Sequence, residues 1–224
     1  NPTMYPKLPH DPQKGLQKVA QLGYPPNLLA VAPLLPVKSV KELIAYAKSS
    51  PGKLSFGSSG SGTTLHLGME LFMLMTGTRM VHVPYKGAAQ ATTEMMAGQV
   101  QLMFDNFNSI FPHVKSGRVR GLGVTSLKRW SALPDLPTID EAGVPGFELI
   151  VWGGVVVPVR VPKPIVGKLN AEINKALASP ALKEKFASIG YELVGGTPEQ
   201  FDAFVRKEAA KWADVIKRSG AKVN

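Results

Sequence analysis

Residues 57–66 read GSSGSGTTLH, a polar turn that joins a predicted strand at 53–56 to a predicted apolar helix at 64–75. Backbone N–H groups at a helix start have no partners within the helix, and the helix dipole places partial positive charge there. The three glycines of this stretch let the backbone approach a ligand, and its five hydroxyl side chains add donors. Such a turn is suited to bind a carboxylate or a phosphate.

The turn does not match established phosphate-binding or nucleophile motifs. No Gly-Lys-Ser/Thr follows it, and the third glycine of a dinucleotide fingerprint would fall at Leu65. Gly57-x-Ser59 continues to Ser61 and not to glycine, so it is not a nucleophile elbow. The alternative to an anion site is a flexible turn in which Thr63 or Thr64 is the N-cap of the helix.

The chain is basic, with a formal net charge of +10. Such a charge is compatible with a small acidic ligand or with a polyanion such as nucleic acid. Lysine and arginine are dispersed along the predicted helices and do not alternate with aromatic residues in blocks. This dispersion favours a solvated basic surface that steers small anions, and it argues against a nucleic-acid partner.

Composition excludes several kinds of site. The chain has no cysteine, which rules out disulfides, thiolate metal sites and cysteine catalysis. The four histidines show no metal-ligand spacing, so we expect no metal and no cofactor. The longest apolar run, 151–159, is interrupted by Gly153, Gly154 and Pro158 and is too short to span a membrane.

Strands and helices alternate through the first two thirds of the chain, which indicates a parallel-dominated α/β sheet. We expect strands at 27–32, 53–56, 80–83, 100–104 and 121–125, with helices at 39–48, 64–75, 88–97 and 109–115. The longest strand signal is 147–157, and helices are expected at 163–177, 180–189 and 198–218. Capping boxes are predicted at Ser39–Glu42, Thr138–Glu141 (opening a short helix) and Thr197–Gln200.

Three loops follow predicted parallel strands: the serine-glycine turn, the segment 84–87 and Asp105–Asn106. Ligands of open α/β sheets gather at the carboxyl ends of the strands. Tyr85 is expected either to contact a ligand or to be a turn residue. Asp105 is expected to accept from a ligand, to cap the next helix, or both.

Other side chains leave alternatives open. Ser58, His66 and Asp105 provide the residue types of a hydrolase, and Ser59 with His66 is the pair that such an enzyme would use. Trp152 either forms an apolar wall of a cleft or belongs to the core. Core packing is the simplest explanation of the methionines Met69, Met73, Met75 and Met80.

Taken in order, several motifs resemble the periplasmic receptors of tripartite tricarboxylate transporters, also called Bug receptors. They are GSSGSG (57–62), VPYKG (83–87), GQVQLMFDN (98–106), ALPDLPT (132–138), EAGVPGF (141–147) and TPEQF (197–201). The resemblance covers essentially the whole chain. It implies a two-lobed, type II periplasmic-binding-protein (Venus flytrap) architecture of the α/β class, and a receptor without catalytic activity.

The resemblance also implies an organisation and a site. Residues 1–27 with 148–224 would form the first lobe, and 28–147 the second. A small carboxylate would bind in an interlobe cleft and be delivered to the membrane permease. The ligand-binding residues would be Ser58, Ser59, Gly60, Ser61, Gly62, Thr63, Thr64, His66, Tyr85 and Asp105.

Family members have a longer N-terminal part than this chain, including a first strand and a glycine-rich loop. The first lobe is therefore expected to be incomplete, and exposed strand edges would favour self-association. A serine hydrolase-like enzyme and a basic nucleic-acid-binding module are the alternative functions.

Overall fold

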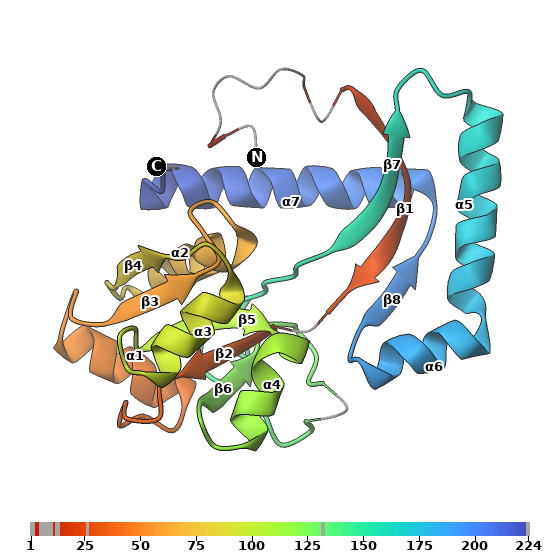
Figure 1. The fold of residues 1–224 in the computed structure, drawn as a ribbon. Helices are drawn as coiled ribbons and strands as arrows, with labels where there is room; N and C mark the ends of the chain where they lie inside the picture. Colours follow the sequence, from red (N-terminus) through yellow and green to blue (C-terminus); the bar gives the residue numbers. More distant parts are fainter. Residues whose placement is uncertain (1–2, 5–10, 12–13, 26, 131–132, 223–224) are drawn as a thin grey trace. The chain divides into compact units, whose positions relative to one another are not determined.

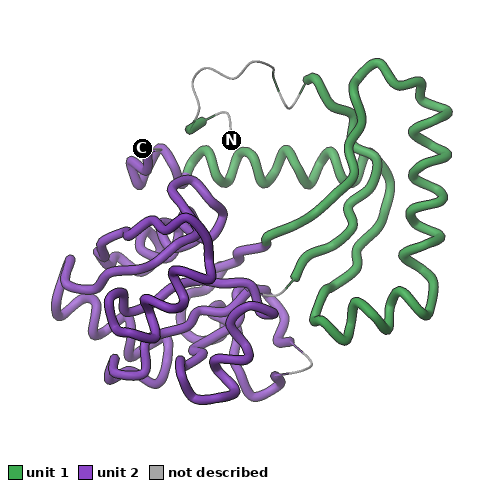
Figure 2. Tube along the Cα trace, viewed as in Figure 1, with its two compact units in different colours: residues 1–25, 151–214 green, residues 26–150, 215–224 purple. Residues whose placement is uncertain are grey.

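The computed structural model describes residues 3–4, 11, 14–25, 27–130 and 133–222. It divides into two compact units, which Figure 2 colours separately. Unit 1 consists of residues 1–25 and 151–214, and unit 2 of residues 26–150 and 215–224. The sequence-based division assigned all of 148–224 to one lobe, whereas residues 215–224 group with unit 2. The irregular segment expected at 1–12 lies almost entirely outside the described residues.

Unit 1 contains a three-stranded antiparallel sheet with strand order β7-β1-β8 (Figure 1). Its strands are β1 (Leu16–Tyr24), β7 (Gly153–Pro158) and β8 (Glu192–Gly195). Its helices are α5 (Lys163–Ala178), α6 (Pro180–Ser188) and the part of α7 (Pro198–Ser219) that ends at Asp214. The three helices begin close to the predicted positions because a proline occupies an early helical position in each.

Sequence reasoning missed strands β1 and β8. In β1 the polar residues Lys18 and Gln21 are buried, so the strand lacks the alternation that marks a half-buried strand. Its pairing with β7 also contains two register shifts. β8 has only four residues, which is too short to give a clear pattern.

Unit 2 contains a five-stranded sheet with strand order β4-β3-β5-β2-β6. Its strands are β2 (Asn27–Val31), β3 (Ser55–Ser58), β4 (Val81–Pro84), β5 (Leu102–Asn106) and β6 (Arg120–Val124). Its helices are α1 (Val40–Ser49), α2 (Thr64–Thr76), α3 (Ala88–Met96) and α4 (Phe107–Lys115). β3 runs parallel to β4 and β5, while β2 is antiparallel to β5 and β6. The sheet is therefore mixed: the predicted parallel order holds for β3, β4 and β5, and β2 departs from it because it runs in the opposite direction.

Both faces of this sheet are covered by helices. Along β5, Met103 joins a buried cluster with residues of α3 and α4, such as Met95 and Ile110. The next residue, Phe104, points to the opposite face, where its ring contacts Phe72 of α2 at a centroid distance of 6.4 Å. A sheet buried on both faces explains why β2 is an uninterrupted run of buried residues.

The capping predictions hold at the level of hydrogen bonds. The Thr138 and Thr197 boxes close in both directions. Ser39 accepts from the Glu42 N–H at 3.1 Å, but the Glu42 carboxylate accepts from the Lys38 N–H at 2.7 Å in place of the Ser39 N–H. The short helix expected after Thr138 is wrong, since only turns form there.

The structure also decides the extent of the strand near residue 153 and the burial of two side chains. The strand expected at 147–157 is confined to β7, because Gly153 is the first residue that pairs with β1. Met75 is 40% exposed and is not a core residue. Trp152 is a packing residue of unit 1, where its ring makes edge contacts with Phe201 and Phe204.

Candidate functional site

Three segments meet at one edge of the sheet of unit 2. Because β3, β4 and β5 are parallel, the residues that follow them leave the sheet on the same side. The Tyr85 N–H donates to the Ser58 carbonyl at 3.0 Å, which joins the segment after β4 to the turn after β3. Asp105 lies at the corresponding end of β5. The predicted alignment of the three loops is confirmed.

The serine-glycine turn (residues 58–64) has a shape that depends on its glycines. Gly60 has φ +132° and Gly62 has φ +79°, conformations that side chains with a Cβ rarely adopt. The Gly60 carbonyl accepts hydrogen bonds from the Thr63 N–H (3.3 Å) and from Thr63 Oγ1 (2.9 Å). The turn is therefore closed on itself before α2 begins.

Thr63 is the N-cap of α2. Its Oγ1 accepts a hydrogen bond from the His66 N–H at 3.4 Å. Of the two candidates from the sequence, Thr63 and not Thr64 thus caps the helix. The capping role uses the Thr63 hydroxyl completely, because the same atom also donates to Gly60.

Other donors of the turn have no internal partner. Among the described residues, no hydrogen bond is made by the backbone N–H groups of Ser59, Ser61, Thr64 and Leu65. The hydroxyl groups of Ser59, Ser61 and Thr64 also lack a partner there, and these three residues are partly exposed. Together with the dipole of the 13-residue helix α2, they form a set of donors suited to an anion.

Ser58 has an internal role. Its side chain is completely buried, and its Oγ lies 2.6 Å from His82 Nε2 and 3.1 Å from the Gly60 carbonyl oxygen. Ser58 Oγ also accepts from the Gly60 N–H at 3.2 Å. We therefore revise the expectation that Ser58 contacts a ligand directly: its hydroxyl holds the turn.

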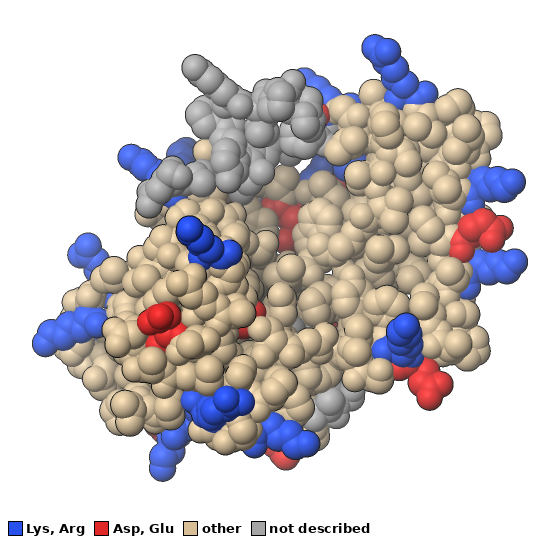
Figure 3. Space-filling model, in the orientation of Figure 1, with Lys and Arg blue, Asp and Glu red and all other residues tan. Residues whose placement is uncertain are grey.

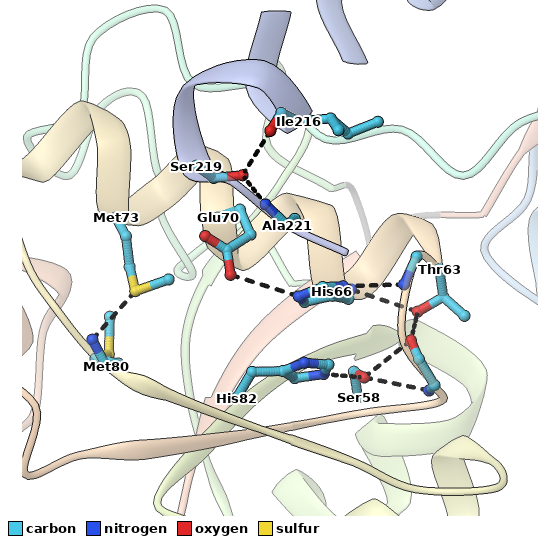
Figure 4. Close-up of polar contacts among 12 residues, drawn as sticks. Ser58, Thr63, His66, Glu70, Met73, Met80, His82, Ile216, Ser219 and Ala221 are labelled. Atoms are coloured by element: carbon cyan, nitrogen blue, oxygen red, sulfur yellow. Dashed lines mark hydrogen bonds and ion pairs between the residues drawn. The ribbon is translucent and has the colours of Figure 1, made fainter. Parts of the chain in front are cut away.

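His66 is likewise engaged inside unit 2 (Figure 4). Its Nδ1 accepts from the Gly62 N–H at 3.0 Å, and its Nε2 lies 3.4 Å from Glu70 Oε1. Both ring nitrogens are used, so the geometry gives His66 a supporting role and no direct ligand contact.

The His66 ring stacks on the ring of His82. The ring centroids are 3.7 Å apart and the planes differ by 9°. Burial, and secondarily the charge of His66, lowers the pKa of His82 to about 4. Sequence reasoning missed the roles of His82 and Glu70; the spacing of Glu70 four residues after His66 was the available signal.

Tyr85 lies next to the turn and is half-buried. Its ring packs against the hydrophobic cluster shared by α3 and α4, and its hydroxyl has no partner among the described residues. Burial, with a smaller contribution from the Glu94 carboxylate, raises the pKa of Tyr85. A neutral phenol is thus available beside the turn.

Asp105 is fully buried and internally bonded. Its carboxylate accepts from the Asn106 N–H at 2.7 Å and from Thr92 Oγ1 at 3.4 Å, and it is also bonded to the Ser109 side chain. Burial raises the pKa of Asp105 in spite of these bonds. The N-cap residue of α4 is Asn106, so Asp105 supports the helix start from the preceding position, and its oxygens are not exposed to a ligand.

The geometry does not assemble the hydrolase considered from the sequence. Both nitrogens of His66 have other partners, and the serine that contacts a histidine is the buried Ser58. Within the described part of the chain, no group of three histidine or acidic side chains is arranged to hold a metal ion. The same part contains no helix long and apolar enough to cross a membrane.

Positive charge is spread over the surface. In Figure 3 the lysine and arginine side chains are scattered over the face in view and do not merge into one basic block. This pattern agrees with the dispersion seen in the sequence and favours diffuse attraction of small anions.

The comparison with protein families identifies this arrangement. A family model described as "Tripartite tricarboxylate transporter family receptor" matches residues 1–221. The chain belongs to this family. Membership confirms the predicted resemblance and the prediction that this receptor chain is not an enzyme.

The receptor chain is 38% identical over 95% of its length to "UPF0065 protein in tcbD-tcbE intergenic region" of Pseudomonas sp. (strain P51). It is 34% identical over 99% of its length to Protein BugT of Bordetella pertussis. It spans 63% and 68% of the lengths of these two relatives.

Solved structures resemble the receptor chain over nearly its full length. "R. palustris Rpa4515 with adipate" has a TM-score of 0.88 at 40% identity, and 99% of the receptor chain matches 74% of that chain. The periplasmic binding protein BugD has a TM-score of 0.84 at 32% identity, with 100% and 75% covered. MatC from Rhodopseudomonas palustris with bound malate has a TM-score of 0.81 at 29% identity, with 96% and 74% covered. The predicted α/β periplasmic-binding-protein fold is confirmed.

Proposed function

We propose that the chain captures a small organic carboxylate and presents it to the permease of a tripartite tricarboxylate transporter in the periplasm. The observation that carries the proposal is the set of unpartnered donors around the start of α2. Two similar structures hold dicarboxylates, adipate and malate. Because the chain spans less than two thirds of one close relative, its solute and its permease are part of the proposal.

One carboxylate of the solute would sit at the serine-glycine turn. It would accept from the N–H groups of Ser59, Ser61 and Thr64, whose hydroxyls add further donors. Tyr85 would offer its neutral phenol from the adjacent segment. Ser58, His66 and Asp105 would contribute by fixing the backbone. Closure of a second lobe over the solute stays a prediction from the family resemblance.

Thr64→Pro tests the turn with little effect on folding. Proline at the first helical position is favourable, and Thr63 already has the extended ψ of 158° that a following proline requires. The substitution removes one unpartnered N–H and one hydroxyl. Since a hydrogen bond to a charged group contributes about 1.5–3 kcal/mol, we expect affinity for the solute to fall by about tenfold or more.

The measurement is calorimetry on the 224-residue chain with adipate, malate and succinate, and with adipamide as an uncharged counterpart. Thr64→Ala, which keeps the N–H, should show a smaller loss than Thr64→Pro. Ser49→Ala, at the end of α1, is the control and should bind normally. Equal affinity of Thr64→Pro and the unmodified chain would overturn the site, and no binding of any carboxylate would overturn the function.

A further inference from the structure

Two stacked histidines lie directly beneath the serine-glycine turn. His66 comes from α2 and His82 from β4, and Phe56 of β3 stacks on His82 at a centroid distance of 4.9 Å. His66 is 3% exposed. Each imidazole contacts a different part of the turn, and Figure 4 shows both sets of bonds. Their position suggests a role beyond filling space.

His66 can support the turn in only one protonation state. Its Nδ1 accepts the Gly62 N–H, so this nitrogen carries no proton. The neutral ring therefore carries its proton on Nε2, which faces Glu70 Oε1. A second proton would place an N–H on Nδ1 opposite the Gly62 N–H, and the bond that holds Gly62 would be lost.

His82 acts through Ser58. Its Nε2 lies 2.6 Å from Ser58 Oγ, which in turn bonds to both the N–H and the carbonyl of Gly60. Because the Ser58 hydroxyl donates its one proton to the Gly60 carbonyl, it accepts from His82 Nε2, and His82 thereby orients the hydroxyl toward Gly60. The two histidines thus fix the two glycines that set the backbone of the turn.

We propose that His66 and His82 are positioning residues, and that the turn keeps its anion-binding shape only while the His66 imidazole is neutral, so that solute binding weakens in acid. The inference rests on the proposed function for its effect on binding. Its structural part, the support of Gly62, is independent of any solute.

A charged imidazole near an anion site would also attract the solute, so the two effects oppose each other. In the part of the chain that the structure describes, the titratable groups in contact with His66 are Glu70 on its own helix and His82 on β4. Phe56 of β3 adds an uncharged ring. The Glu70 carboxylate would neutralise a proton on His66 at close range. Little net charge would then reach the turn, and loss of the Gly62 bond is the larger effect.

Two substitutions keep the hydrogen bonds to the turn but remove the imidazole that can take up a proton. In His66→Asn, Oδ1 takes the place of Nδ1 and accepts from Gly62 without titrating. In His82→Gln, the amide takes the place of Nε2 and keeps a bond to Ser58. His66→Phe keeps the stacked ring but removes the acceptor. His113→Asn, in α4, is the control for a general effect of removing a histidine.

The first measurement is made without solute. The Gly62 amide is followed by NMR and by hydrogen exchange between pH 8 and pH 5, with exchange rates corrected for the intrinsic effect of pH. We expect the amide to lose protection in acid in the unmodified chain and in His113→Asn, and to stay protected in His66→Asn. Equal protection at both ends of the range in the unmodified chain would overturn the proposal.

The second measurement is adipate affinity over the same range, expressed as the ratio between each variant and the unmodified chain, which cancels protonation of the solute itself. The affinity of the unmodified chain should fall about three- to tenfold relative to His66→Asn in acid, the value of one lost hydrogen bond. His66→Phe should bind weakly at every pH. A ratio that is constant with pH, or that changes in the opposite direction, contradicts the proposal.

Absence of binding in all variants, with the Gly62 response intact, would contradict the proposed function alone.

Discussion

Thr63 shows how much a single residue can contribute to this site. One hydroxyl donates to the Gly60 carbonyl and accepts from the His66 N–H. Loss of a threonine N-cap costs about 1 kcal/mol. We therefore expect Thr63→Ala to lower the free energy of unfolding by about 1–2 kcal/mol in urea denaturation, because a second hydrogen bond is lost as well.

Thr63→Ser keeps the hydroxyl and should retain most of this stability. Thr64→Ala is the matched control, since the Thr64 hydroxyl has no partner among the described residues. It should change stability by less than about 0.5 kcal/mol. A loss in Thr64→Ala as large as that in Thr63→Ala would contradict the assignment of the cap.

Asp105 gives a prediction about pH. Burial raises the pKa of its carboxyl group, so the folded state holds the proton at pH values where the unfolded chain has already released it. Stability is therefore lost as pH rises from the ordinary pKa of an aspartate towards the raised value. Asp105→Asn removes this titration. In thermal unfolding between pH 3 and pH 7, the melting temperature of Asp105→Asn should fall less steeply with rising pH than that of the unmodified chain.

The exposed Asp135 offers a comparison on the same unit. Asp135→Asn should leave the pH dependence of the melting temperature as it is in the unmodified chain. If Asp105→Asn and Asp135→Asn give the same profile, burial of Asp105 does not determine this slope.

At the scale of the element, helix α2 contains a glycine that packing requires. A Cβ on Gly68 would lie 2.5 Å from Leu149 Cδ2, and Leu149 is itself 1% exposed. Overpacking a buried site costs about 1–3 kcal/mol, which exceeds the gain of about 1 kcal/mol from replacing glycine by alanine in a helix. Gly68→Ala should therefore destabilise the protein by up to about 2 kcal/mol in chemical denaturation.

Gly167 in α5 provides the opposite case. No atom lies within 4 Å of the position that a Cβ would take there, and the residue is exposed. Gly167→Ala should stabilise the protein by about 0.5–1 kcal/mol through helix propensity alone. If both substitutions stabilise the protein, the packing of Gly68 against Leu149 does not require a glycine in α2.

At the scale of the whole molecule, both sheets end in strands that carry exposed valines. Val81 in β4, Val156 in β7 and Val194 in β8 are 51%, 42% and 48% exposed, and all three strands are outermost in their sheets. Open apolar edges pair readily with other chains. We expect concentration-dependent self-association, which replacement of the three valines by lysine should weaken about tenfold in sedimentation velocity.

Leu34→Lys is the control for this prediction. Leu34 is 86% exposed but lies in a loop, so its replacement removes apolar surface without blocking an edge. The edge assignment fails if Leu34→Lys and the triple lysine variant sediment alike at every concentration.

Local patterns in the sequence were sufficient to predict most elements of unit 2. The alternation of strands and helices, the cap at Ser39 and the alignment of three loops were all predictable, because each depends on neighbours within about four residues or on the parallel order of strands. The N-cap of α2 was narrowed to Thr63 or Thr64, and the structure selects Thr63. β1 was not readable, since Lys18 and Gln21 are buried among partners from distant parts of the chain.

The sequence by itself determined where the turn lies, that α2 starts just after it, and that unpartnered donors belong at that start, because helix geometry leaves those N–H groups free wherever they occur. Only the tertiary structure decided which polar side chains remain available. It brings His82 onto His66, and it buries Ser58 and Asp105 among internal partners. The physical reason is that burial and contact across the sheet depend on the order and direction of strands, which no local pattern of residues encodes.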